Sequence, residues 1–371
     1  MNLKHTLLPF ATLAMQLANA QLVVDNTLTP TALVQDLLLG TGITASNVQF
    51  NDLDGTEVNE QIGAFSEGIS AVGWPQGLII ATGDVLVALG PNDAGGASLG
   101  GGNFGADDLD LEVLSGVPTN DRAVLEMDFV SDGNGVQLLF AFASEEYPEF
   151  ACSPVNDVLG IFLSGPGITG PFTNDAINLA VLPGGNVPVA INSVNPGVAG
   201  SSGTASNCAA IDPNWQANSI YYLENGDPAS MQFDGRTVGL IAFGELQAGL
   251  SYHLKIAVAD GADTAYDSAL FLAANSFTSD LTTAVPAIPG AAAARLAMMD
   301  GGLAVENLPT GVDAMLVVDG MGRVLSRHPV EGSTERALIP LQGAAAGLYL
   351  LHLNGSNGFQ QVLKFVIGEG R

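Results

Sequence analysis

Short apolar runs separated by turns are the feature that most limits the folds open to this chain. Glycine and proline account for 46 and 19 of its 371 residues, and both interrupt helices and favour tight turns. Residues 123–129 alternate apolar and polar side chains, as a strand with one buried face does. Many short strands of this kind predict an all-β fold, an antiparallel β-sandwich or jelly roll. The predicted strands before residue 284 are 48–50, 77–81, 123–130, 136–143, 158–164, 177–182, 189–193, 237–243, 252–259 and 268–277.

One helix and one hairpin are predicted within this pattern. Thr29 and Pro30 precede an apolar segment at residues 31–39, and Gly40 follows it. A capping threonine, a proline in the first turn and a terminal glycine are typical helix boundaries. We expect this to be the only substantial helix before residue 284. The loop at residues 131–135 has the sequence Ser-Asp-Gly-Asn-Gly between two strand-like runs, which predicts a β-hairpin.

The chain divides into a large and a small unit. Residues 284–294 are rich in alanine and proline and predict a linker between a domain at residues 21–283 and one at residues 295–371. The small unit again contains short apolar runs and turns, so it is predicted to be a compact β domain. Its predicted strands are 303–306, 314–318, 324–326, 336–340, 348–353 and 361–367.

The N-terminal segment is typical of a secretion signal. Residues 1–20 contain Lys4, an apolar run at residues 7–17 and the closing sequence Ala18-Asn19-Ala20, which is the small-x-small pattern of a signal-peptidase site. The mature protein is expected to begin at Gln21. No later segment approaches the roughly 20 apolar residues that span a bilayer, so no transmembrane segment is expected.

Two cysteines, Cys152 and Cys208, lie in the large unit. In an oxidising compartment outside the cytoplasm, one disulfide between them is the simplest hypothesis. Two free buried thiols are the alternative.

The charge is concentrated in the large unit. Residues 21–284 hold three bases, Arg122, Arg236 and Lys255, against 31 acids, which accounts for the whole net charge of −28. Such a surface repels phosphate backbones and anionic lipid, so nucleic-acid binding is not expected, and cations are the expected small partners. The alternative is that the acidity only keeps an exported protein soluble.

Clustered acids suggest a calcium site. Asp260, Asp263 and Asp267 are separated by small residues in one turn, and Asn156 with Asp157 could add oxygen ligands. The flanking runs are strand-like, so this is not an EF-hand. A second candidate comprises Asp107, Asp108 and Asp110. Solvated turns without an ion are the alternative for each cluster.

Few residues are candidates for catalysis or for binding a cofactor. Glu145, Glu146 and Glu149 could supply the acid and base of a glycosidase-like hydrolase, although neighbours on a strand face opposite sides. His253 alternates with Tyr252 and Leu254 on a predicted strand and is expected to be a structural or partly exposed histidine and not a catalytic base. The glycine-rich loop at residues 100–105 formally matches a dinucleotide fingerprint, but no helix pattern follows it and Asp107 and Asp108 would repel a pyrophosphate.

The large unit resembles the choice-of-anchor L domain, a secreted bacterial module that occurs with several kinds of surface-attachment tail. The resemblance covers roughly residues 22–277 and implies no established catalytic activity. The matching motifs, in order, lie at residues 81–85, 142–150, 156–160, 163–167, 234–237, 252–255, 259–260 and 267–272.

The small unit resembles a type IX secretion C-terminal sorting domain. Three motifs carry the resemblance: the Gly-Arg turn at residues 317–324, the Gly-x-Tyr strand at 346–351 and the Lys-containing strand at 362–366. The resemblance implies an Ig-like β-sandwich that the outer-membrane machinery of a Gram-negative bacterium recognises and often cleaves. Residues 368–371 extend past the usual last strand.

Together these features predict a secreted module on the outer cell surface that binds or adheres, with an extracellular glycan or another surface protein as its ligand and with structural calcium. Trp74 and Trp215 could stack against sugar or belong to the core. The alternative function is the secreted hydrolase that uses Glu145, Glu146 and Glu149.

Overall fold

The computed structural model describes residues 21–100, 107–183 and 186–279 of the large unit. In the small unit it describes residues 295–299, 302–306, 308, 312–319, 324–330, 336–341, 347–354 and 360–367. The predicted signal peptide, the predicted linker and most of the glycine-rich loop lie outside the described residues.

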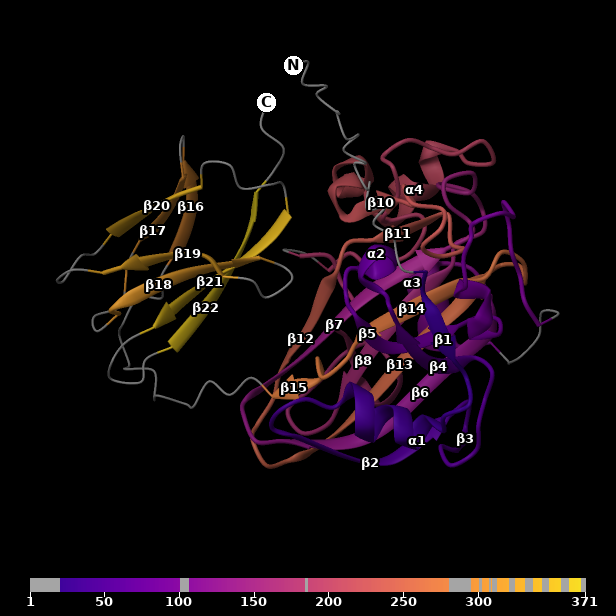
Figure 1. Cartoon of the computed structure of the whole chain (residues 1–371), viewed down its shortest axis with the longest axis horizontal. Coiled ribbons are helices and arrows are strands. Elements are labelled where there is room, and N and C mark those ends of the chain that lie inside the picture. The colour runs from indigo at the N-terminus through magenta and orange to yellow at the C-terminus, as the bar shows by residue number, and fades with distance from the viewer. Residues whose placement is uncertain are drawn as a thin grey trace, which may run out of the picture.

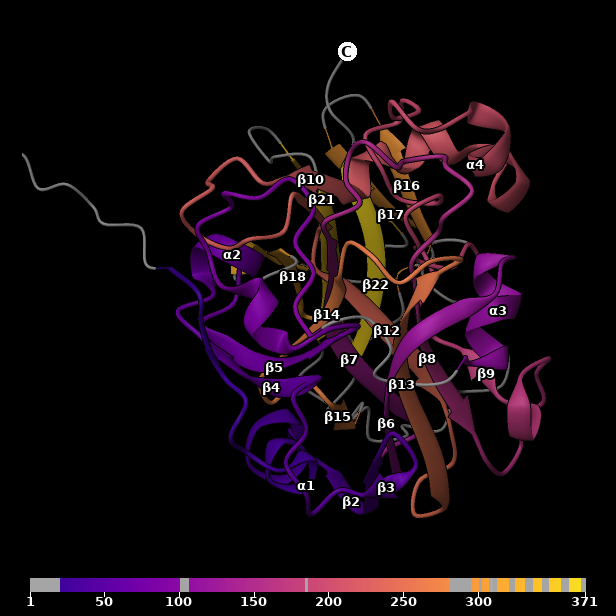
Figure 2. The ribbon, with the colours of Figure 1, turned by 90° about the vertical axis from the view of Figure 1, so that its right-hand side faces the viewer.

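The large unit is built on two antiparallel sheets (Figures 1 and 2). The first has nine strands, in the order β1-β4-β5-β14-β7-β11-β10, and β12 and β15 also pair with β7. Its strands are β1 (Val23–Asp25), β4 (Ile62–Ser66), β5 (Gln76–Ala81), β7 (Gly135–Ser144), β10 (Tyr222–Glu224), β11 (Gly235–Thr237), β12 (Leu240–Glu245), β14 (Ser268–Ala273) and β15 (Thr278–Ser279).

The second sheet has six strands, in the order β3-β2-β6-β13-β8-β9. Its longest members, β6 and β13, run side by side and antiparallel, with Leu254 opposite Met127 and a shift of register between Val258 and Asp260. The strands are β2 (Ile43–Phe50), β3 (Leu53–Asp54), β6 (Thr119–Ser131), β8 (Val158–Ser164), β9 (Ile177–Asn178) and β13 (Ser251–Gly261).

The main core lies between the two sheets. Phe140 and Phe142 of the first sheet and Leu125 and Met127 of the second are buried in one apolar cluster. Period-two alternation sends these side chains inward and their neighbours outward. In a β-sandwich, one face of each sheet is buried against the other sheet. The predicted all-β sandwich is therefore confirmed.

Both sheets are also partly covered on their outer faces. Phe271 of β14 and Ile79 of β5 belong to a second cluster with Phe233. Phe162 of β8 and Val124 of β6 pack in a third cluster with Leu111 of helix α3 (Leu109–Ser115). This second covering explains why β8 and β14 are buried at every position instead of alternating.

The N-terminal helix has the predicted boundaries. Thr29 is the N-cap, its hydroxyl accepting a hydrogen bond from the Ala32 amide, and Pro30 occupies the first position. A single turn, α1 (Pro30–Ala32), continues as a π-helix to Leu38. The expectation that no other substantial helix precedes the linker is wrong, because α3 and α4 (Ala205–Ile211) each span seven residues. Shorter helical turns are α2 (Ile69–Val72), η2 (Val85–Ala88) and η3 (Thr173–Asp175). A 3₁₀ helix, η4 (Trp215–Tyr221), also spans seven residues.

The predicted hairpin at residues 131–135 is wrong. The loop does reverse the chain, but β6 pairs with β2 and β13, whereas β7 pairs with strands of the other sheet. The loop therefore crosses from one sheet to the other. The Ser131 hydroxyl donates to the Gly133 carbonyl inside this crossing. Turn residues specify a reversal of direction and not whether the two strands pair or face each other.

Two strand predictions fail in the segment after β8. The predicted strand at residues 177–182 is reduced to β9, and residues 189–193 form an isolated bridge and then a turn. The Ser193 hydroxyl accepts from the Ala190 amide and donates to the Pro188 carbonyl. Such side-chain bonds replace the ladder bonds that a strand would need.

The small unit is a separate sandwich. One sheet has the order β16-β17-β20 and the other the order β19-β18-β21-β22. Its core includes Leu303, Val317 and Leu351. The strands are β16 (Arg295–Met299), β17 (Gly302–Glu306), β18 (Ala314–Asp319), β19 (Val324–Pro329), β20 (Arg336–Pro340), β21 (Gly347–Asn354) and β22 (Gln360–Ile367). Six of these strands were predicted, and β16 was not.

Candidate ligand groove and carboxylate cluster

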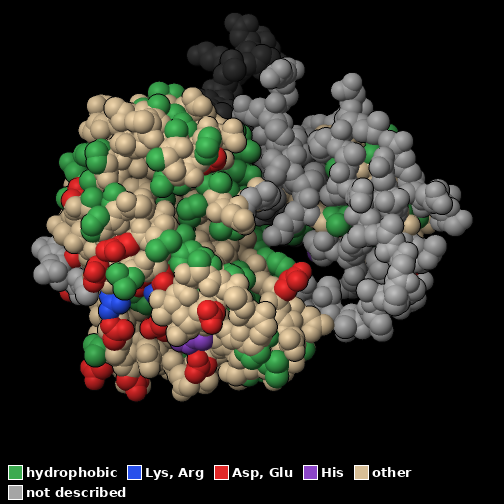
Figure 3. Space-filling view, turned by 180° about the vertical axis from the view of Figure 1, so that it is seen from behind, with side chains coloured by type: hydrophobic (Ala, Val, Ile, Leu, Met, Phe, Trp, Pro, Cys, Tyr) green, Lys and Arg blue, Asp and Glu red, His purple; other side chains and the backbone are tan. Residues whose placement is uncertain are grey.

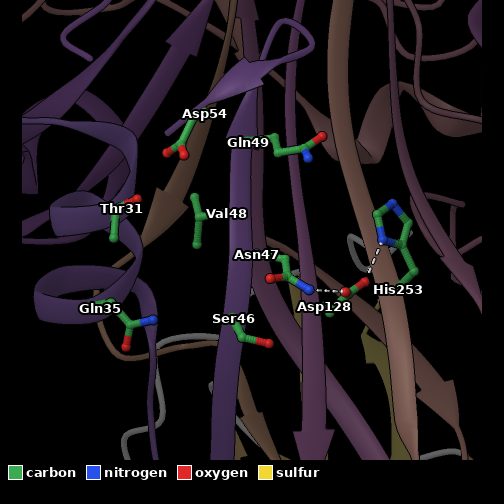
Figure 4. Close-up of a pocket in the computed structure, with 9 residues that line it drawn as sticks. All are labelled: Thr31, Gln35, Ser46, Asn47, Val48, Gln49, Asp54, Asp128 and His253. Atoms are coloured by element: carbon green, nitrogen blue, oxygen red, sulfur yellow. Dashed lines mark hydrogen bonds and ion pairs between the residues drawn. The ribbon is translucent and has the colours of Figure 1, made fainter. Parts of the chain in front are cut away.

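A polar groove of about 510 Å³ opens where the first helix meets the outer face of the six-stranded sheet. Figure 4 shows side chains from five elements around it: the helical segment, β2, β3, β6 and β13. Val48 is its one apolar lining residue. The others are Thr31, Gln35, Ser46, Asn47, Gln49, Asp54, Asp128 and His253.

A bulge in β2 gives the groove its shape. The register between β2 and β6 shifts between Ser46 and Gln49, and Asn47 adopts a left-handed backbone with φ of 50°. Asparagine tolerates this conformation better than most residues, and a bulge redirects the side chains around it. The side-chain Nδ2 of Asn47 donates to Asp128 Oδ2 over 2.6 Å. Sequence reasoning missed this groove, because its parts lie far apart in the chain.

His253 is held between two acids. Its Nδ1 lies 2.9 Å from Asp128 Oδ1 and its Nε2 lies 3.2 Å from Glu126 Oε1. The hydrogen bond with Glu126 raises the pKa of the imidazole, and the bond with Asp128 adds to this rise. Burial lowers the pKa, but its effect is smaller than that of the bond with Glu126. The expectation of a structural, partly exposed histidine agrees with this geometry. Both ring nitrogens are therefore engaged by carboxylates, and the imidazole is fixed in the groove wall.

The surface of the large unit is mainly acidic and has small patches of basic side chains and histidine. Figure 3 shows acidic side chains gathered over the lower half of one face, beside small blue and purple patches. Both tryptophans are in the core instead: Trp74 is 7% exposed and Trp215 is 4% exposed. Neither is therefore a platform on which a sugar could stack.

A buried group of acids lies at one end of the sandwich, where several strands end. We call Glu146, Asp157, Asp260, Asp263 and Asp267 the strand-end cluster. Glu146 follows β7, Asp157 precedes β8, and Asp260 is the penultimate residue of β13. Asp263 and Asp267 lie in the loop from β13 to β14. The predicted turn of aspartates therefore meets both Asp157 and one of the three predicted catalytic glutamates.

Asp157 joins the two sheets within this cluster. Its Oδ1 accepts from the Gly261 amide of β13 over 2.9 Å, and its Oδ2 accepts from the Ser268 hydroxyl of β14 over 2.5 Å. Burial raises the pKa of Asp157 to about 8 despite these bonds, and the charges of Asp263 and Asp267 add to the shift.

Glu146 and Asp260 have no such partners. Each residue is 0% exposed, and no hydrogen-bond donor reaches either oxygen of either carboxylate. Burial, with the charges of Asp157 and Asp263, raises the pKa of Glu146 to about 11. Burial also raises the pKa of Asp260 well above its ordinary value, with the charge of Asp157 next in importance. The Thr82 hydroxyl lies near Asp260 and opposes this shift.

The remaining predicted ligands are placed differently. Asp267 is 4% exposed and its Oδ2 accepts from the Leu99 amide, while burial raises its pKa to about 7. Asp263 is partly exposed, and its Oδ1 accepts from the Ala265 amide. Both ends of the Asn156 side-chain amide are hydrogen-bonded: its Nδ2 donates to the Ser115 carbonyl, and its Oδ1 accepts from the Asn192 backbone N–H.

The three predicted catalytic glutamates do not face one surface. Glu145 accepts from the Ala97 amide and, through burial, has its pKa raised to about 8, with Asp234 as its charged neighbour. Glu146 faces Asp157 and Asp263 instead. Glu149 is exposed. Two buried acids in different surroundings and one exposed acid do not form the facing pair that glycoside hydrolysis uses.

The second predicted calcium cluster already has a cation. Lys255 Nζ lies 2.7 Å from Asp108 and 2.9 Å from Asp110. Asp108 is also the N-cap of α3, where it accepts from the Asp110 and Leu111 amides. Burial disfavours ionised Asp110, but hydrogen bonds from Lys255 and Thr173 outweigh it and lower its pKa. Asp107 lies next to Asp108 and is exposed.

The two cysteines form the disulfide that was predicted. The Cα atoms of Cys152 and Cys208 lie 4.8 Å apart, and both residues are fully buried beside Trp215. The bridge ties the loop after Glu146 to helix α4. The described residues therefore contain no free cysteine.

Comparison with known proteins identifies the large unit. The family described as "Choice-of-anchor L domain" matches residues 22–278, which confirms the resemblance of that unit. The match does not include residues 295–371. No curated protein matches the chain.

Similar solved structures are distant. A β-glucuronidase from Ruminococcus gnavus in complex with D-glucuronic acid has 8% identity and a TM-score of 0.21, covering 88% of this chain and 45% of that one. The BSP domain of a biofilm-associated protein has 8% identity and a TM-score of 0.20, covering 73% and 53%. The adhesin domain of Epf from Streptococcus pyogenes has 10% identity and a TM-score of 0.17, covering 69% and 80%. The chain thus spans about half the length of the first two.

Proposed function

Because the chain belongs to the choice-of-anchor L domain family, we propose that it is a secreted module of the outer cell surface that binds an extracellular glycan or another surface protein. The family indicates an extracellular or cell-surface protein. No helix in the described part of the chain is long and apolar enough to span a membrane.

The polar groove is the observation that carries the binding function. Amide, hydroxyl, carboxylate and imidazole groups line it, with a single apolar residue, and such a mixture of donors and acceptors suits the hydroxyl groups of a sugar. The large unit has three bases against 31 acids. A neutral or cationic ligand is therefore favoured over an anionic polysaccharide.

Substitution within the groove is expected to weaken binding to neutral glycans. Asp128→Asn removes the charge that holds Asn47 and His253 in place, and Gln49→Ala removes an exposed lining group. A hydrogen bond contributes about 0.5–1.5 kcal/mol between neutral groups and about 1.5–3 kcal/mol to a charged group. Gln49→Ala is therefore expected to weaken retention by up to about tenfold, and Asp128→Asn by about tenfold or more. The measurement is binding of the full chain to a glycan array, followed by titration of the retained glycan.

Gln76→Ala is the matched control, because Gln76 is an exposed glutamine on β5 of the other sheet. If Gln76→Ala and Gln49→Ala weaken retention equally, the groove is not the binding site. If the array retains nothing, a surface protein becomes the ligand to test. Release of shortened sugars would instead favour the hydrolase.

Export is proposed to depend on both ends of the chain. Residues 1–20 would direct the protein across the inner membrane, and residues 295–371 would be recognised by the type IX secretion machinery of a Gram-negative bacterium. The separate core of the small unit supports this division, since Leu303, Val317 and Leu351 pack in a cluster of their own. A self-contained β domain can be recognised and removed without unfolding the large unit.

Deleting residues 295–371 is therefore expected to trap the protein in the periplasm of a type IX host. Cell fractionation should find nearly all of the truncated protein there, whereas the full chain should reach the surface or the medium. A protein carrying a substitution in the groove, such as Gln49→Ala, should be exported normally and serves as the control. Equal export of the truncated protein would contradict the sorting role of the tail.

A further inference from the structure

The strand-end cluster has unsatisfied oxygens in a place that excludes water. Both carboxylate oxygens of Glu146 and both of Asp260 are buried without a hydrogen-bond donor, and both residues are 0% exposed. Burying an ionised carboxylate without a partner costs far more than burying a hydrogen-bonded one. These two side chains therefore point to a partner that is not part of the protein.

No base of the large unit can serve as that partner. Residues 21–284 contain three, and each is engaged elsewhere. Arg122 pairs with Asp52, and Lys255 pairs with Asp108 and Asp110. Arg236 donates to the Thr237 carbonyl, and burial alone lowers its pKa to about 10. His253 lies between Glu126 and Asp128. The cluster therefore has no counter-charge from a base of the large unit.

Asp157 connects the other acids of the strand-end cluster. It lies near both Glu146 and Asp260, because its charge acts on both. Its bonds to Gly261 and Ser268 fix it between the two sheets. Asp263, partly exposed, is also near Glu146, and gives the buried acids a polar route to solvent.

We propose that the strand-end cluster binds one calcium ion, with Glu146, Asp157 and Asp260 as its buried ligands and Asp263 as its ligand on the solvent side. This site is independent of the groove and of the proposed binding function. The ion would tie the ends of β7, β8 and β13 together and so link the two sheets at one end of the sandwich.

The ligand chemistry selects calcium. All of the ligands are carboxylate oxygens, and neither histidine nor cysteine takes part, which favours hard cations over zinc or copper. Calcium accepts six to eight oxygens in irregular arrangements, whereas magnesium demands a near-ideal octahedron. Carboxylates from three separate strand ends and a loop match the flexible requirement better.

The ligands are not yet gathered around one point. No three His, Cys, Asp or Glu side chains among the described residues lie in an arrangement that could already hold an ion. Like charges repel, so these carboxylates converge on one point only when a cation or a shared proton lies between them. Rotation of the Glu146 and Asp260 side chains is free of the cost of breaking hydrogen bonds, because they make none.

The test is calcium binding by the purified full chain after removal of metals with EDTA. Calorimetric titration with calcium chloride is expected to find one site of about 0.1–1 mM, the range of extracellular calcium modules. If the dissociation constant is near 0.1 mM, then 10 mM calcium should raise the melting temperature of the large unit by roughly 5–10 °C relative to EDTA. The same concentration of magnesium should raise it much less.

Glu146→Gln tests the ligand, and Glu149→Gln is its matched control on the same turn. The control removes an exposed carboxylate and should keep the full calcium-dependent shift. Glu146→Gln should lose most of that shift. In EDTA it should melt no lower than the unaltered protein, because it replaces a buried carboxyl that makes no hydrogen bond. A glutamate with only a structural role would instead lower the melting temperature in both conditions.

Two results would overturn the proposal. In the first, the unaltered protein neither releases heat with calcium nor changes its melting temperature, which would mean that the acids share protons and hold no ion. In the second, Glu146→Gln responds to calcium as the unaltered protein does. If Glu146→Gln does not fold, Asp260→Asn replaces it under the same criteria, and the calorimetry of the unaltered protein decides the outcome by itself.

Discussion

Replacing Cys152 and Cys208 together by alanine is expected to lower the free energy of unfolding of the large unit by about 4 kcal/mol. The two cysteines are 56 residues apart in sequence, and a cross-link that closes so long a loop removes much of the entropy of the unfolded chain. Both side chains are fully buried beside Trp215. The loss therefore includes some packing as well as the cross-link.

Tryptophan fluorescence during denaturant unfolding measures this change selectively. The chain has two tryptophans, Trp74 and Trp215, and both are buried in the large unit, so unfolding of the small sandwich does not contribute to the signal. The unaltered protein with its disulfide reduced is the control, and it should lose a similar amount. A loss below about 1 kcal/mol in both samples would contradict the expectation that the bridge stabilises this unit.

The strands could be predicted where the pattern of apolar residues along the sequence reflects which side chains are buried. In β6 the apolar side chains of Ala123, Leu125, Met127 and Phe129 alternate with less buried neighbours, because the core covers one face. In β8 every residue is buried, because Leu111 of α3 covers the outer face as well. Both patterns are local, so a single sequence reveals them.

Helix α3 was missed although its boundary signals are present. Asp108 is a capping residue, and Gly116, with φ of 75°, ends the helix. The helix is seven residues long and exposes Leu109 and Val113, so its apolar residues do not form the single stripe that identifies an amphipathic helix. Its stability comes from packing Leu111 and Leu114 on the sheet, which depends on tertiary structure.

Pairing partners and shared sites could not be predicted for a related reason. The turn at residues 131–135 has ordinary hairpin chemistry, yet it connects two sheets. The acidic turn at residues 260–267 was recognised as a candidate site, but the approach of Glu146 to Asp157 depends on how the end of β7 meets the start of β8. The groove combines Gln35, Gln49 and His253, and no local pattern relates them.

Replacing Lys255 by methionine is expected to lower the free energy of unfolding by roughly 3 kcal/mol. Its ammonium lies between Asp108 and Asp110, whose side chains are 3% and 7% exposed. Methionine keeps much of the packing against Phe162, above whose ring the ammonium lies at 5.1 Å. It leaves two buried carboxylates without a cation, and removing one partner of a buried ion pair is strongly destabilising because the remaining charge is uncompensated.

Arg122→Met is the matched control, since it removes a base whose partner is exposed. Asp52 is 68% exposed, and a pair with an exposed partner contributes about 0.2–1 kcal/mol. Denaturant unfolding followed by tryptophan fluorescence should therefore give a much larger loss for Lys255→Met than for Arg122→Met. Equal losses would show that solvent reaches Asp108 and Asp110 well enough to replace the ammonium. In that case burial would not explain why these acids need Lys255, and the same reasoning would be weakened for Glu146 and Asp260.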